Sequence, residues 1–360
     1  MTAAGMANDA GMDDSMDEHM DEHMDEPMDE PVETRVARTK LPSGWRIVAA
    51  KEFADHLSSV RLYVLFLVLG AAALIPMYFA AERIRSLANA ASGAQAVFLA
   101  LFWLSPQGLS LLTVDQFVQI AAPLLGLGFA FDAINGERAE GTLPRLLSQP
   151  IHRDDVVNGK FVAGLGAIGT VLLAVVAVIA AFGLLRLGII PAPVEILRLA
   201  IWLFVTVLYV ALWLAFGLLL SVVIRRAATS ALVGFGVWLF VAVPLFGQLV
   251  VSILGSFLAP TSGTPDQVLA AANTQQFLLR LLPSTLYREA SIVLLDPGVT
   301  TISSPATIGQ YDQLQQQIPS LLTLDQSLLL IWPHIVTLLA ITAVCFAVAY
   351  IQFMRQEVRA

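Results

Sequence analysis

The sequence predicts an all-α membrane protein with six transmembrane helices, an amphipathic interfacial helix before the first of them, a cytoplasmic hairpin and a large external loop before the last. Hydrophobic residues make up 57% of the chain and charged residues only 13%, which is more apolar surface than the core of a soluble domain can bury. The apolar residues gather in long runs, and the charges gather between the runs, where they can remain in water.

Residues 1–42 form a separate acidic segment. The repeat between Met16 and Pro31 is densely charged and has too little apolar surface to offset the entropy of ordering it, so we expect a disordered cytoplasmic tail. Twelve of the 28 acidic residues lie before Arg35, and the remaining 16 face 20 basic residues, so only the tail is acidic. The first apolar run begins beyond residue 60, which argues against a secretory signal peptide.

Two histidines of this tail, His19 and His23, are candidate metal ligands. They stand four residues apart among methionines, and on a transient helix these side chains could offer soft ligands to copper or nickel. A solvated acidic tail is the favoured interpretation, because carboxylates dominate and no folded scaffold fixes a coordination geometry. Cys345 is the single cysteine, which excludes an intramolecular disulfide and a cysteine metal cluster.

The stretch 43–60 has the pattern of an amphipathic helix. Its apolar face carries Ala49, Phe53, Leu57, Val60 and Val64, and its polar face carries Arg46, Lys51, Glu52, Asp55 and His56. We expect this helix to lie along the membrane surface, with Trp45 in the headgroup layer. A cytosolic helix packed on something other than the membrane is the alternative.

Six apolar runs reach the length of about 20 residues that a helix needs to cross a bilayer. They cover residues 62–81, 113–131, 161–185, 199–224, 228–252 and 327–354. We expect the fifth to bend near Pro244, since proline removes a helical hydrogen bond. The apolar stretch 96–104 is too short to cross and is expected to lie in the interface or to pack within a loop.

The distribution of Lys and Arg predicts the orientation. With both termini, residues 132–160 and the Arg225–Arg226 turn inside, 14 basic residues lie on the cytoplasmic side and six on the other. The external side then carries the loop 255–326, which is rich in Pro, Gly, Thr, Ser and Gln. Within it we expect helices over residues 274–282 and 284–294.

The charged hairpin, residues 132–160, joins the second and third predicted spans. Glu137, Arg138 and Glu140 would cap the cytoplasmic end of the second span, Gly141 breaks the pattern, and Thr142 can act as an N-cap. A short helix would follow, with Leu143, Leu146 and Leu147 on one face, Arg145 beside them and Pro150 at its end. Such a helix has the form of a part that docks into a groove of a soluble partner. The alternative is a charged loop that only satisfies topology.

The charged hairpin closely resembles a motif of ABC transporter permeases of the type-2 (type V exporter) family. The matching residues are Gly136-Glu137-Arg138-Ala139-Glu140-Gly141-Thr142-Leu143, Leu146-Leu147-Ser148, Pro150, Arg153 and Gly159-Lys160. A second motif, Leu282-Pro283-Ser284 with Leu286-Tyr287, resembles the subgroup associated with multi-copper-enzyme maturation. The resemblance covers about residues 44–356, and Pro144 departs from the polar residue more usual at its position.

This resemblance implies that the charged hairpin forms a coupling helix, which contacts a separate ATP-binding subunit. The residues it assigns to ATPase coupling are Glu137, Arg138, Glu140, Gly141, Thr142, Leu143, Arg145, Leu146 and Leu147. It further implies a second permease subunit, identical or different, and transport out of the cell. ATP and Mg²⁺ would bind to the partner ATPase, so no cofactor is expected in this chain.

The sequence lacks the motifs expected of an ATP-hydrolysing subunit or of an ion-coupled carrier. No phosphate-binding loop of the form GxxxxGK[ST] occurs, and the Gly159-Lys160 pair lacks both the upstream glycine spacing and a following Ser or Thr, so this chain is not expected to hydrolyse ATP. No nucleic-acid partner is expected. The spans contain no paired acidic or histidine residues of the kind that relay ions, and His334 is expected to be an interfacial or packing histidine.

Two functions other than ATP-driven transport remain open at this stage. A membrane scaffold or sensor would anchor partners and move nothing, and an ion-coupled carrier would transport without ATP. The sequence does not name the substrate. Apolar spans would suit a hydrophobic or amphipathic one, and a role in copper-enzyme maturation is the second choice.

Overall fold

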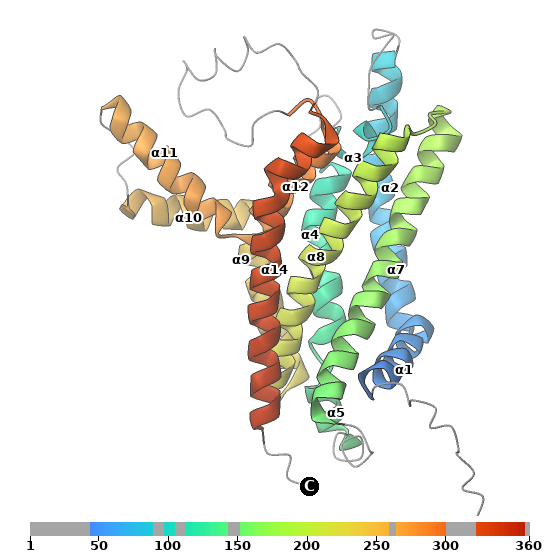
Figure 1. The fold of residues 1–360 in the computed structure, drawn as a ribbon, viewed down its shortest axis with the longest axis vertical. Coiled ribbons are helices and arrows are strands. Elements are labelled where there is room, and N and C mark those ends of the chain that lie inside the picture. Colours follow the sequence, from blue (N-terminus) through green and yellow to red (C-terminus); the bar gives the residue numbers. More distant parts are fainter. Residues whose placement is uncertain are drawn as a thin grey trace, which may run out of the picture. The chain divides into compact units, whose positions relative to one another are not determined.

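The computed structural model describes residues 44–88, 97–104, 112–142, 152–258, 264–299 and 322–356. In these ranges all regular secondary structure is helical (Figure 1). The helices are α1 (Gly44–Ser58), α2 (Val60–Ala88), α3 (Ala100–Trp103), α4 (Val114–Ala130), α5 (Asn135–Ala139), α7 (Arg153–Leu187), α8 (Pro193–Val223), α9 (Ala227–Val241), α10 (Pro244–Leu258), α11 (Pro265–Arg280), α12 (Pro283–Leu295) and α14 (Leu324–Arg355). The predicted tail, with His19 and His23, lies outside the described residues.

Five segments are long and apolar enough to cross a membrane, which confirms the predicted class of all-α membrane protein. They are Val60–Ser86, Val114–Ala139, Arg153–Leu187, Pro193–Val223 and Leu324–Arg355, and each contains all or nearly all of one predicted span. The third begins eight residues before the predicted boundary at Phe161, so the charged residues from Arg153 to Lys160 already lie on a helix. Its first turn carries Asp154 and Asp155, which favour a helix N-terminus.

The fifth predicted span, 228–252, is not one helix. It divides into α9 and α10, which meet at an angle of 69°. The bend at Pro244 is confirmed, because α10 begins at this proline, which cannot donate a helical hydrogen bond to the preceding turn. With 15 residues, α9 is about 22 Å long and therefore shorter than a bilayer core of about 30 Å. The chain has six spans only if the bent pair counts as one.

Helix α8 is the centre of the packed core. It packs against α14, α4, α12, α7 and α9, and Figure 1 shows it running beside α14 and α4. Trp202, Tyr209 and Trp213 of α8 are almost fully buried, and Tyr209 stacks on Tyr287 of α12 with 4.5 Å between ring centroids. Burial of such large aromatic side chains supplies much of the contact area that orders the bundle.

Outside the predicted spans lie α3, α11 and α12, of which α11 packs against α10 and α12. The described part of the apolar stretch 96–104, residues 97–104, packs within the fold, since Phe98, Leu99 and Phe102 are buried. Helix α12 matches the helix predicted for residues 284–294, but α11 begins nine residues earlier than predicted. The reason is a capping box, in which the Thr264 N–H donates to Gln267 Oε1 over 3.0 Å and Pro265 occupies the first helical position.

Helix α1 packs on α7 through part of the predicted apolar face, whereas Val60 and Val64, predicted on the same face, belong to α2 and are exposed. Val48 and Ala49 are buried, and Phe53 and Leu57 pack against the core. The approach is close: a Cβ on Gly159 of α7 would lie 2.6 Å from the Cβ of Val48. Glycine is therefore required at position 159, and α1 is attached to the bundle at the level where α7 begins.

Candidate functional site

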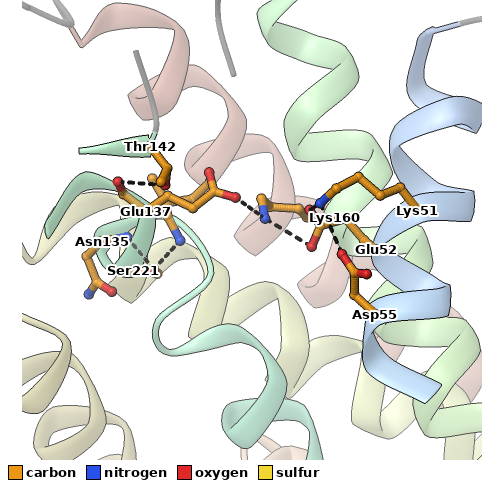
Figure 2. Close-up of polar contacts among 9 residues, drawn as sticks. Lys51, Glu52, Asp55, Asn135, Glu137, Thr142, Lys160 and Ser221 are labelled. Atoms are coloured by element: carbon orange, nitrogen blue, oxygen red, sulfur yellow. Dashed lines mark hydrogen bonds and ion pairs between the residues drawn. The ribbon is translucent and has the colours of Figure 1, made fainter. Parts of the chain in front are cut away.

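The first limb of the charged hairpin is fixed to the end of α8. The N–H groups of Ile134 and Asn135 both donate to Ser221 Oγ, over 2.9 and 3.2 Å, and Figure 2 shows Ser221 beside Asn135. Asn135 Nδ2 donates to the carbonyl of Ile224 over 3.1 Å. Asn135 is fully buried. These bonds satisfy the free N–H groups at the start of α5 and hold this short helix in one place.

Lys160 joins three helices at the charged hairpin. Its Nζ lies 2.7 Å from Glu137 Oε1 of α5 and 3.1 Å from Glu52 Oε2 of α1, and Figure 2 shows the amine between the two carboxylates. The Lys160 side chain is only 8% exposed, and those of Glu52 and Glu137 are 13% and 22% exposed. Glu52 was predicted on the polar face of its helix; in the structure this part of the face meets the buried Lys160 and not water.

The ammonium group of Lys160 and the carboxylates of Glu52 and Glu137 have little exposure to water, so each charge needs its partners for compensation. Removing the cation from a buried pair leaves an uncompensated charge and costs about 3–5 kcal/mol. Glu137 Oε2 is buried and has no hydrogen-bond partner among the described residues, so Glu137 depends on Lys160 for its charge compensation. The Lys160 cluster, defined as Lys160, Glu52 and Glu137, therefore couples α5 mechanically to α1 and α7.

The other described residues assigned to ATPase coupling are Arg138, Glu140, Gly141 and Thr142, and each has a different environment. Gly141 adopts a left-handed conformation with φ of 69°, which confirms that it breaks the pattern, because only glycine adopts this conformation without strain. Thr142 Oγ1 donates to the carbonyl of Glu137 over 3.2 Å, and Glu140 is exposed. Arg138 donates to Gln356 after α14. Leu143, Arg145, Leu146 and Leu147 lie outside the described residues, and the coupling role of every hairpin residue stays a prediction.

A second ion pair fixes the start of the hairpin. Arg61, in the first turn of α2, approaches Asp132 with Nη2 to Oδ2 at 2.7 Å and Nη1 to Oδ1 at 3.1 Å. Arg61 Nη1 also donates to the carbonyl of Gly128 over 3.0 Å. This two-pronged geometry orients both side chains, although both are partly in water and the pair is correspondingly weaker than a buried one.

Helix α1 carries two titratable groups with shifted pKa values. The carboxylate of Asp55, 3.0 Å from Lys51 Nζ, raises the pKa of Lys51. Burial lowers the pKa of His56, whose ring packs edge-on against Phe129 with 5.0 Å between centroids. The raised pKa favours the charged form of Lys51 at neutral pH, and the lowered pKa favours the neutral form of His56.

The opposite end of the bundle holds polar residues that the sequence analysis did not connect. His334 of α14 is buried and lies 2.8 Å from Glu289 of α12, which also accepts from Arg280 Nε of α11 over 3.0 Å. His334 is thus a packed histidine, as predicted, but with a carboxylate partner 45 positions away in the sequence. Arg198 of α8 is buried and donates to Ser327 Oγ over 3.1 Å.

Comparison with known proteins identifies the family. The family model "ABC-2 family transporter protein" matches residues 46–358. "Probable ABC transporter permease protein NosY" of Stutzerimonas stutzeri is 31% identical over 173 residues, which are 46% of this chain and 56% of NosY, so the match spans little more than half of that relative. The family predicted from the hairpin motif is confirmed. Because the family model covers nearly the whole sequence, the chain belongs to the ABC-2 family of transporter proteins.

Proposed function

We propose that this protein is the transmembrane permease subunit of an ATP-driven exporter, and that a separate cytoplasmic ATPase subunit drives it through the charged hairpin. The observation that carries the proposal is the Lys160 cluster, which joins the hairpin to α1 and α7 by two close ion pairs. A loop whose only role was to connect two spans would not require Glu137 to form an ion pair with Lys160, whose side chain is only 8% exposed.

The mechanism follows from how the hairpin is held. An ATPase subunit that closes on ATP would push residues 143–151 and α5, which is bonded to Ser221 of α8 and to Lys160 of α7. Because packed helices move as rigid bodies, a displacement of α5 tilts α7 and α8 rather than bending a loop. With two permease subunits, such a tilt opens and closes a path between them. Export as the direction of transport, and the cytoplasmic position of both termini, rest on the resemblance and on the charge distribution.

The proposal is tested with the ATPase subunit and purified permease in lipid nanodiscs. The variant Leu146→Ala with Leu143→Ala should weaken binding of the ATPase subunit at least about tenfold, the scale of losing two buried leucine contacts. The control is Leu329→Ala, because Leu329 lies on α14 and is 71% exposed. Binding and ATPase stimulation equal to the wild type in the hairpin variant would contradict the docking role.

A membrane scaffold or sensor is the competing function. It predicts that the complex forms but that no substrate moves when ATP is hydrolysed, so a transport assay in sealed vesicles separates the two. An ion-coupled carrier would transport without ATP and stop when the ion gradient is collapsed.

A permease for copper-enzyme maturation is the second candidate for the substrate class. The motif that favours it forms the corner between α11 and α12, where Ser284 donates to the carbonyl of Val241 and Gln119 Nε2 donates to the carbonyl of Ser284 over 2.9 Å. The motif thus fixes α12 to α4 and to the end of α9. Deleting the gene should then abolish the activity of a copper enzyme in the source cell, and full copper-enzyme activity in the deletion strain would argue against the role.

A further inference from the structure

We propose that Gln356 is a positioning residue that ties the last span to both limbs of the charged hairpin; this inference rests on the proposed function. Gln356 follows α14 directly. Its Oε1 accepts from Arg138 of α5, and its backbone carbonyl accepts from Arg153 Nη1, over 3.1 Å, at the start of α7. Its Nε2 donates to the carbonyl of Val222 in the last turn of α8 over 2.9 Å.

These bonds bring four helices together at one residue. Arg138 lies before the segment 143–151 and Arg153 lies after it, so the two arginines hold the two limbs of the hairpin. Among the described residues, Gln356 is the sole hydrogen-bond acceptor of the Arg138 side chain, and Arg138 forms no ion pair there. A neutral amide therefore anchors the guanidinium, and loss of that amide frees the arginine instead of leaving a buried charge on the partner.

The arrangement complements the Lys160 cluster. Lys160 connects α5 to α1 and α7, whereas Gln356 connects the same short helix to α14 and α8. At its other end α14 is bonded to α8 through Ser327 and Arg198, and to α12 through His334 and Glu289. Movement of the hairpin consequently reaches α14 at its C-terminal end.

The test replaces Gln356 by methionine, which has a similar volume and no hydrogen-bonding amide. Gln356→Met should keep the affinity for the ATPase subunit within about twofold, since residues 143–147 are unchanged. It should reduce stimulation of ATPase activity about tenfold, the scale of losing a hydrogen bond to a charged group. Gln356→Glu keeps an acceptor for Arg138 and should retain most of the stimulation.

The matched control is Gln352→Met, one turn earlier on α14, where the side chain is exposed and has no hydrogen bond to the described residues. The distance between spin labels at positions 142 and 354 gives a readout that needs no ATPase subunit, and its distribution should broaden in Gln356→Met alone. Unchanged stimulation in Gln356→Met, or a loss explained fully by a lower melting temperature, would overturn the positioning role. Failure of the wild type to bind or stimulate the ATPase subunit would instead refute the proposed function.

Discussion

Replacing Lys160 by methionine should lower the free energy of unfolding by about 3–5 kcal/mol and abolish stimulation of the ATPase subunit. The substitution keeps the aliphatic stem but leaves the carboxylate of Glu137 without a cation, and leaves Glu52 with only the exposed Lys51, whose Nζ lies 3.5 Å from Glu52 Oε1. The Glu52 and Glu137 oxygens lie 3.1 and 2.7 Å from Lys160 Nζ, so the two carboxylates are close to each other. The measurement is thermal or denaturant unfolding of the purified protein in detergent, together with ATPase activity in nanodiscs.

Lys51→Met is the control for this substitution. Lys51 also pairs with Glu52 and Asp55, but its side chain is 64% exposed, so its removal should cost less than about 1 kcal/mol. Adding Glu137→Gln to Lys160→Met should recover part of the lost stability, because the negative charge that has lost its cation is then removed. If Lys160→Met unfolds like the wild type, the cluster does not hold the hairpin.

Replacing Gly126 by alanine should destabilise the bundle by about 3 kcal/mol or more. A Cβ at this position of α4 would lie 2.8 Å from two backbone atoms of α8, the nitrogen of Leu214 and the carbonyl oxygen of Val210. Backbone atoms of the central helix cannot rotate away as a side chain can, so α4 and α8 must separate along their length. The melting temperature and the yield of folded protein would report the loss.

Gly128→Ala offers a matched control on the same helix. A Cβ there meets nothing closer than Leu65 Cδ1 at 3.8 Å, and alanine has a higher helix propensity than glycine. This variant should therefore be neutral or more stable by about 0.5–1 kcal/mol. Equal behaviour of the two alanine variants would contradict the close contact between α4 and α8.

The fold could largely be predicted from the sequence because membrane spans are a matter of length and composition. Five predicted spans correspond to helices of sufficient length, and their boundaries differ mainly where polar residues continue the helix, as from Arg153 to Lys160. The separation of α9 from α10 was foreseen only as a bend at Pro244. An angle of 69° depends on what α10 packs against, and composition carries no information about that.

The candidate site was predicted in part. The motif around Glu137 indicated which segment acts, but not which partners hold it, because Glu52, Lys160 and Gln356 are distant in the sequence. Arg138 and Gln356, for example, are separated by 218 positions. The pattern of 43–60 placed Glu52 on a polar face, and only the packing of α1 on α7 shows that this face meets Lys160. Helix periodicity identifies a face and does not identify its neighbour.

The most direct test of the account is where the charged hairpin lies relative to the membrane. In a Cys345→Ala background, Thr142→Cys places an exposed thiol beside α5, and Asp266→Cys places one on the exposed surface of α11. A maleimide reagent that cannot cross membranes should label position 266 in intact cells and position 142 only after the cells are opened. Labelling of position 142 in intact cells would place the hairpin outside, out of reach of any cytoplasmic ATPase, and would contradict the coupling role.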